Sequence, residues 1–278
     1  MTTLMFYQAP APLNAAVSLR MRVRPLNGDY RFAAVTNSVP LAAVEFFDVA
    51  REWPIVFTDD EKPYPAMLTG VRNQENLLVG DDGSWQGRYV PAFIRRYPFV
   101  LGERPDSKDF DVYIDEGYEG INSEDGERLF NDDGSHTPLL KLALEFLSQF
   151  QGEVERTTRF VERLNELDLL VPRRLEVSRP GQTPRVLQGF RVVDEARLQA
   201  LDDAALLTLA RSGQLAWIYA HLMSLSNVGA LAERLDKITA LAEAPPVEVV
   251  EPNVTGESAE TEATESAGKS GKKGISHV

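Results

Sequence analysis

The stretch from Trp85 to Gly102, WQGRYVPAFIRRYPFVLG, is the most hydrophobic and aromatic part of the chain. Two prolines, Pro91 and Pro98, interrupt it. Each proline removes a backbone donor and restricts the preceding residue to extended conformations, which argues against a long helix here. We therefore predict a central, mostly buried segment, with one helical turn at 92–96 and a strand over 99–101.

The same stretch supplies the candidate ligand-binding residues. Two arginines lie among apolar neighbours, and a buried guanidinium needs a carboxylate or carbonyl partner. One of them could bind an anionic ligand; an internal ion pair or a solvent-facing pair is the alternative. The aromatic residues could line a pocket or form the domain core. The candidates are Trp85, Tyr89, Arg95, Arg96 and Tyr97.

The residues before this stretch predict strands and hairpins. Apolar and polar residues alternate over 17–24, which predicts a half-buried strand. Asn27, Gly28 and Asp29 favour a turn into a second strand over 30–35. Further strands are expected at 55–57, 66–71 and 76–79.

An acidic segment follows. Residues 103–133 hold 12 acidic and three basic residues, so about nine of the 13 net negative charges lie there. Phe110, Val112 and Ile114 alternate with polar residues that include Asp115, which predicts a strand with an acidic outer face. The spacing does not match an EF-hand loop, and we assign no metal site. The net charge argues against a nucleic-acid partner.

The C-terminal half predicts helices. Thr137 and Pro138 favour a helix start, and apolar residues at four-three spacing predict one helix through Gly152 to about Asp168. A hairpin is expected from 174–178 and 186–193, with Pro180, Gly181 and Gln182 as its turn. Asp194 and Asp202 are expected to cap short helices, and 214–225 and 227–243 to form a buried and an amphipathic helix.

These elements define the predicted architecture. We expect an α+β fold in which a mixed or antiparallel sheet from N-terminal strands and hairpins is covered by C-terminal helices. Residues 1–243 would form one globular domain, and 244–278 a disordered acidic tail because that run carries too few apolar residues to fold. We find no signal peptide and no apolar run of about 20 residues, so we expect a cytoplasmic protein without a membrane span.

No motif identifies a reaction or a cofactor. The chain has no cysteine, and we find no nucleophile elbow, phosphate-binding loop, dinucleotide fingerprint or zinc-protease motif. His136, in a loop before the long helix, is the better general-base candidate. His221 lies in an apolar helix and is expected to be a packed, hydrogen-bonded core residue.

Several blocks in order resemble the SapC family, bacterial proteins named after a surface-layer-associated member. The blocks are WPIVF at 53–57, NLLVGDDGSWQGRYVPAFIRRYPFVLG at 76–102, RLF at 128–130, GFRVVDEARLQAL at 189–201 and SGQLAWIYAHLMSL at 212–225. The resemblance covers about 12–235. It implies a bacterial protein linked by name to surface-layer biogenesis, and it implies no established reaction or catalytic residue.

Three functional hypotheses follow. The first is a non-catalytic accessory or interaction protein for surface-layer or envelope assembly, with a protein partner that contacts the acidic segment 103–133. The second is a small-molecule-binding protein with a pocket near the aromatic cluster 85–99. The third is an enzyme of unrecognised class, in which His136 would face a carboxylate.

Overall fold

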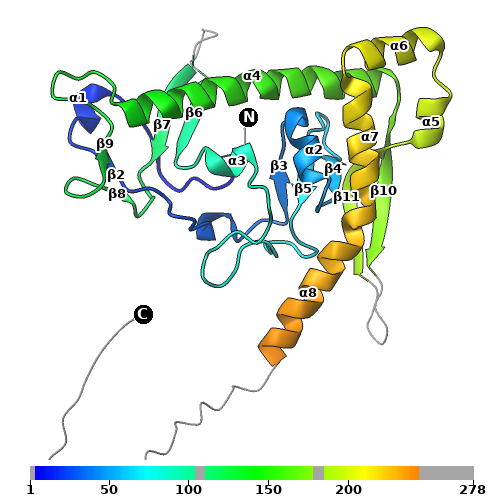
Figure 1. Cartoon of the computed structure of the whole chain (residues 1–278), viewed down its shortest axis with the longest axis horizontal. Coiled ribbons are helices and arrows are strands. Elements are labelled where there is room, and N and C mark those ends of the chain that lie inside the picture. The colour runs from blue at the N-terminus through cyan, green and yellow to red at the C-terminus, as the bar shows by residue number, and fades with distance from the viewer. Residues whose placement is uncertain (1–3, 104–109, 178–184, 244–278) are drawn as a thin grey trace, which may run out of the picture. The chain divides into compact units, whose positions relative to one another are not determined.

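The computed structural model describes residues 4–103, 110–177 and 185–243 (Figure 1). The described part is an α+β protein built from three antiparallel sheets and the helices that pack on them, as the sequence predicted. The predicted tail, 244–278, and the predicted hairpin turn at 180–182 lie outside the described residues.

The largest sheet has five strands in the order β10-β11-β4-β5-β3. All its pairings are antiparallel, and β10 and β11 form the predicted hairpin. β4 and β5 are buried along almost their whole length, which fits their continuous apolar sequences. The strands are β3 (Ser38–Pro40), β4 (Ile55–Thr58), β5 (Pro65–Leu68), β10 (Leu170–Val177) and β11 (Arg185–Val193).

Two smaller sheets have three strands each. In the first, β7 lies between β1 and β6, and the strand predicted over 99–101 is confirmed as β6. In the second, β2 lies between β8 and β9. The strands are β1 (Pro10–Pro12), β2 (Arg22–Val23), β6 (Phe99–Glu103), β7 (Phe110–Asp115), β8 (Ile121–Asn122) and β9 (Glu127–Arg128).

One long helix, α4 (Pro138–Glu166), passes over β6 and β7 and reaches the five-stranded sheet (Figure 1). Its N-terminus is capped by Thr137, whose hydroxyl accepts from the backbone N–H of Leu140 at 3.4 Å. A Cβ built on Gly152 would meet no atom within 4 Å, so this glycine lies on the open side of the helix. The predicted single helix through Gly152 is therefore confirmed.

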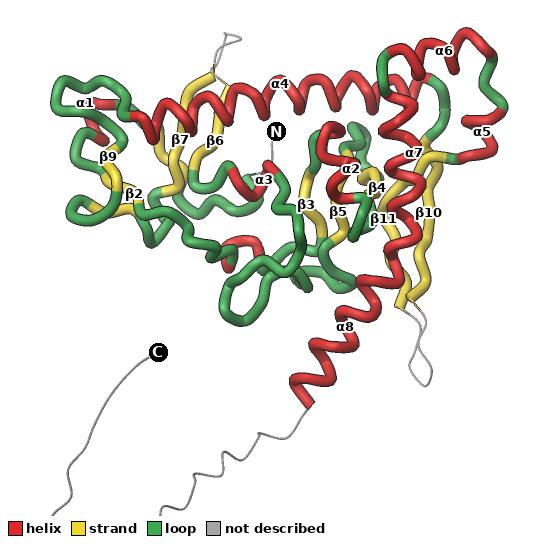
Figure 2. The backbone as a smooth tube through the Cα atoms, in the orientation of Figure 1, coloured by secondary structure: helices red, strands yellow, loops and turns green. Residues whose placement is uncertain are grey.

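The C-terminal helices begin at the predicted caps. The carboxylate of Asp194 accepts from Arg197 N at 3.1 Å, and that of Asp202 accepts from Ala205 N at 2.7 Å. α7 contacts β11 and β4 of the large sheet (Figure 2). The elements are α5 (Glu195–Gln199), α6 (Asp203–Arg211), α7 (Gln214–Ser224), η3 (Leu225–Asn227) and α8 (Val228–Glu243).

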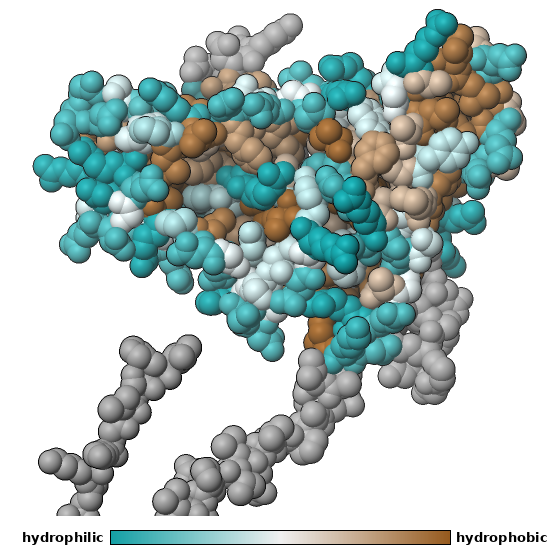
Figure 3. All heavy atoms as spheres, viewed as in Figure 1, coloured by the Kyte–Doolittle hydropathy of each residue, from teal (hydrophilic) through white to brown (hydrophobic). Residues whose placement is uncertain are grey.

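The helical run Gln214–Ile238 is longer than the apolar segment expected from the sequence. By length and composition alone it could cross a membrane, and it is the one such run among the described residues. A third of its most apolar window is buried in the protein. Figure 3 shows hydrophobic surface near α6 and α7, the helices that carry the exposed side chains of Leu207, Tyr219 and Met223.

The strand predicted over 17–24 is wrong for most of its length. Asn14 accepts hydrogen bonds from Ala16 N and Val17 N and starts the short helix α1 (Ala15–Ser18). Val17 is 76% exposed, so this local cap outweighs the alternating pattern. Only β2 remains of the predicted strand.

The strands expected at 30–35 and 76–79 are also absent. The first is the short helix η1 (Arg31–Ala33), and the second contributes a single bridge, Val79 to Trp85. The other short helices are η2 (Ala43–Glu45), α2 (Phe46–Val49) and α3 (Ala92–Arg95), and α3 confirms the helical turn predicted at 92–96.

Candidate binding site

The five candidate residues of the aromatic stretch separate into two groups around α3. Trp85, Tyr89 and Arg95 form the first group. The indole N–H of Trp85 donates to Tyr89 O at 2.8 Å. Arg95 is exposed, and it donates to Val90 O at 3.0 Å and to the Tyr89 hydroxyl at 3.2 Å. These contacts fix the loop that leads into α3, because they join its residues to one another and to Arg95 of the helix.

A buried carboxylate, Glu45, fastens this loop to η2. It accepts from Tyr89 Oη at 2.8 Å, from Ala92 N at 2.7 Å and from Ala42 N at 2.8 Å. Burial raises the pKa of Glu45, while the three hydrogen bonds and nearby Arg95 act in the opposite direction. Burial also raises the pKa of Tyr89, so its phenol stays protonated at neutral pH. The first group is a satisfied structural network.

Arg96 and Tyr97 form the second group and point into the interior. Arg96 is only 6% exposed, and its Nε and Nη2 atoms have no hydrogen-bond partner. Its guanidinium carbon lies 3.9 Å from the centre of the Phe93 ring and 5.7 Å from the centres of the Tyr7 and Phe150 rings. Burial lowers the pKa of Arg96, but a guanidinium stays cationic at neutral pH.

Asp115 is the buried carboxylate beside Tyr97. It is fully buried at the end of β7 and accepts from Tyr97 Oη at 3.0 Å. It also accepts from Gln8 N at 3.1 Å and Ala9 N at 2.7 Å, and so holds the N-terminal segment against β7. The predicted acidic outer face of this strand is therefore wrong for Asp115, because these donors, together with Gly117 N at 3.3 Å, draw its side chain inward.

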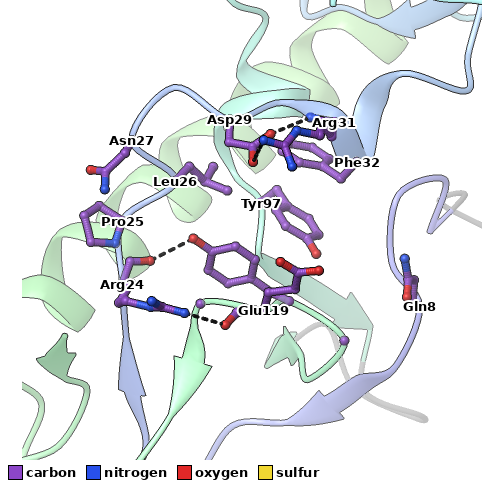
Figure 4. Close-up of a pocket in the computed structure, with 13 residues that line it drawn as sticks. Gln8, Arg24, Pro25, Leu26, Asn27, Asp29, Arg31, Phe32, Tyr97 and Glu119 are labelled. Atoms are coloured by element: carbon purple, nitrogen blue, oxygen red, sulfur yellow. Dashed lines mark hydrogen bonds and ion pairs between the residues drawn. The ribbon is translucent and has the colours of Figure 1, made fainter. Parts of the chain in front are cut away.

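A hollow of about 460 Å³ opens next to this cluster (Figure 4). One wall comes from 24–32 and the other from 117–120, with Gln8 on the side opposite Arg24. Tyr97 and Phe32 line it, and their rings are stacked with centres 4.0 Å apart. Of the five candidate residues, Tyr97 is the one that lines this hollow.

The polar groups of the hollow are held by their neighbours. Arg24 donates to Glu119 O at 3.1 Å, and Arg24 O accepts from the Tyr118 hydroxyl at 2.9 Å. Arg31 forms an ion pair with Asp29 at 3.3 Å. Two arginines and two carboxylates thus balance in charge. Burial raises the pKa values of Tyr97 and Tyr118, so both phenols stay protonated at neutral pH.

Several residues of the site were not selected from the sequence. Arg24 and Arg31 lie in segments we expected to be strands, and Tyr118 lies in a loop of the acidic segment. Gly120 was a signal in the sequence for close packing at this loop, since a Cβ at this position would lie 2.3 Å from the Tyr118 ring. The register that brings 24–32 against 117–120 depends on long-range pairing of β2 with β8, which no local pattern specifies.

The two histidines differ in environment. His136 is exposed, and its ring lies edge-on to Phe130 at 5.6 Å. His221 is fully buried: its Nδ1 donates to Ile55 O at 2.9 Å and its Nε2 accepts from Val193 N at 3.0 Å. Burial lowers the pKa of His221 to about 4. The prediction of a packed, hydrogen-bonded His221 is confirmed.

The fold and the hollow define an α+β protein of three antiparallel sheets, with a polar recess beside a buried charged and aromatic cluster. The chain belongs to the SapC family, because a family model described as SapC matches residues 13–231. Comparisons with curated proteins and with solved structures gave no match.

Proposed function

We propose that this SapC-family protein is a non-catalytic accessory protein of bacterial surface-layer or envelope assembly, and that it recognises a protein partner at the hollow and the acidic segment 103–133. The hollow carries this proposal. One of its walls, 117–120, belongs to the acidic segment, and the opposite wall presents Arg24 and Arg31. A partner that docks on the acidic segment could therefore place a side chain in the hollow. The link to the envelope rests on the family resemblance.

The chemistry of the hollow supports binding in preference to proton transfer. Its phenols stay protonated at neutral pH, and its two arginines already have partners. Such prearranged donors and acceptors favour recognition of a polar group that both gives and accepts hydrogen bonds.

A small molecule is the second candidate occupant. The volume of about 460 Å³ falls in the usual range of ligand pockets, about 300–1,000 Å³. The stacked Phe32 and Tyr97 rings and the carbon atoms of Pro25 and Leu26 would contact its apolar face. This candidate differs from the first in needing no partner protein.

Capture of binding partners from the native bacterium separates the two. The tagged full-length protein is the bait, and bound proteins and small molecules are identified by mass spectrometry. The test variant is the double substitution Arg24→Ala with Arg31→Ala, and the control is Arg20→Ala, an exposed arginine outside the hollow.

A stoichiometric protein that is kept by the control, lost by the double variant and released by added salt supports the proposal. A small molecule with the same dependence on the variants supports the second candidate. Equal capture by wild type and both variants would contradict a role for the hollow.

A further inference from the structure

Arg96 presents an unused hydrogen-bonding edge inside the protein. Its two partnerless nitrogens, Nε and Nη2, are the pair whose N–H bonds run parallel along one side of the guanidinium. This edge matches the two oxygens of a carboxylate or phosphate, which it binds through two parallel hydrogen bonds. The side chain is 6% exposed, so bulk water does not replace the missing acceptors.

The aromatic rings around Arg96 stabilise its charge but leave this edge free. Phe93 lies closest, and Tyr7 and Phe150 complete the surroundings. Cation–π attraction offsets part of the loss of hydration. The hydroxyl of Tyr7 donates its proton to Phe99 O at 2.7 Å, and its oxygen is hydrogen-bonded to the Arg96 side chain. This neutral contact brings no counter-charge, and Nε and Nη2 still have no partner in the described part of the chain.

The neighbouring buried carboxylates are engaged elsewhere. Asp115 accepts from the N-terminal backbone and Tyr97, and Glu45 accepts from Tyr89 and two backbone N–H groups. Among the described residues, no carboxylate forms an ion pair with Arg96. Burial of an unpaired cation is strongly unfavourable, and such a group calls for an explanation.

We propose that the Nε–Nη2 edge of Arg96 is a binding position for a small oxyanion, a carboxylate or a phosphate. The anion supplies the two missing acceptors and the missing counter-charge. This site is separate from the hollow, which Arg96 does not line. Its existence does not depend on the proposed accessory function.

Thermal unfolding of the full-length protein tests the proposal. Sodium acetate and sodium phosphate are titrated at pH 7 against sodium chloride of equal ionic strength. The variants are Arg96→Met, which keeps an unbranched apolar side chain, and Arg95→Met as the control at the adjacent exposed arginine. We expect a saturable rise of Tm in wild type and Arg95→Met, with apparent affinity at least about tenfold weaker in Arg96→Met.

The two anions distinguish the ligand sources. A response to acetate alone assigns a carboxylate, a response to phosphate alone assigns a phosphate, and a response to both assigns a general oxyanion site. Equal titration curves for wild type and Arg96→Met would overturn the proposal.

A second measurement uses only the wild-type protein and does not depend on how the variant folds. The Nε–H resonance of Arg96 is followed by ¹⁵N NMR during the same titrations. We expect a saturable shift of this resonance with the oxyanion and none with chloride. A resonance that does not move with either oxyanion would rule the site out.

Discussion

Two buried polar side chains, His221 and Arg96, differ in charge and in whether the fold supplies their hydrogen-bond partners. His221 lies between α7 and the five-stranded sheet, uncharged, with both ring nitrogens hydrogen-bonded to strand backbone. Arg96 follows α3 and is cationic, with two nitrogens that have no partner. The fold supplies a partner for each ring nitrogen of His221, whereas it leaves two nitrogens of Arg96 without a hydrogen-bond acceptor from the described residues.

The difference separates a polar side chain that serves the fold from one at which we propose a ligand. His221 joins Ile55 of β4 to Val193 of β11, so it replaces hydrogen bonds that the two strands do not make with each other there. The fold, as far as the structure describes it, buries the positive charge of Arg96 without placing a carboxylate in an ion pair with it. We infer that recognition concentrates at the side of the molecule formed by α3, β7 and the N-terminal segment.

The largest expected effect is at Asp115, the buried carboxylate that accepts from Tyr97. Asp115→Ala removes the acceptor of Gln8 N, Ala9 N and Tyr97 Oη and leaves these donors unsatisfied. We expect a loss of about 3–5 kcal/mol in the free energy of unfolding, measured by urea denaturation. Glu116→Ala, at the exposed next residue, should change it by less than about 0.5 kcal/mol. Equal effects of the two variants would show that Asp115 does not hold the N-terminal segment.

The second prediction concerns the pH dependence that His221 imposes. Its folded pKa, about 4, lies below the ordinary value of 6.5, so the unfolded chain binds a proton that the folded protein does not. The stabilisation is complete above about pH 6.5 and is lost as the pH falls toward about 4, by up to about 3 kcal/mol. The stability advantage of wild type over His221→Leu should shrink over this range.

The control for this measurement is His136→Gln, which removes an exposed histidine. Its unfolding free energy should follow the wild-type dependence on pH. A constant difference between wild type and His221→Leu from pH 7 to pH 4 would contradict the assignment of His221 as a buried neutral group.

The third prediction addresses the support of the hollow at β2. Gly126 has φ of +95°, and a Cβ at this position would lie 2.6 Å from Val23 O and 2.9 Å from Arg24 N. Gly126→Ala should lower the free energy of unfolding by about 2–3 kcal/mol, because backbone strain and a backbone clash combine. Gly28→Ala, with φ of +83° and open space around it, should lose only about 1 kcal/mol. If both variants lose the same free energy of unfolding, Gly126 does not lie close to the backbone of β2.

The smallest effect on stability is expected in the hollow. Arg31 is exposed and pairs with a partly exposed Asp29, so Arg31→Ala should change the free energy of unfolding by less than about 0.5 kcal/mol. The same variant should bind the occupant of the hollow more weakly, as measured by calorimetry with the captured partner. Full binding by Arg31→Ala would remove this arginine from the site.

Local patterns predicted the elements that depend on local physics. The cap at Thr137, the apolar stripe of α4 and the caps at Asp194 and Asp202 placed the C-terminal helices correctly. The prolines placed the helical turn at α3 and the strand β6. The alternation over 17–24 failed because Asn14 caps a helix there.

The site was only partly predictable, because its geometry depends on contacts between residues far apart in the sequence. The aromatic stretch drew attention to Arg96 and Tyr97, but an alternating pattern assigned Asp115 to solvent. Its burial depends on donors at Gln8 and Ala9, which are more than 100 residues away in the chain. The hollow likewise depends on the long-range pairing of β2 with β8.

The most direct test compares His221→Leu with Arg96→Met by urea unfolding in buffer with chloride as the only anion. His221→Leu leaves Ile55 O and Val193 N unpaired, so we predict a loss of about 2–4 kcal/mol. Arg96→Met replaces an unpaired buried cation by an apolar chain, so we predict a change within about 1 kcal/mol, or a gain. A loss of more than about 3 kcal/mol in Arg96→Met would show that the fold depends on this guanidinium, and would contradict its assignment as an unfilled binding position.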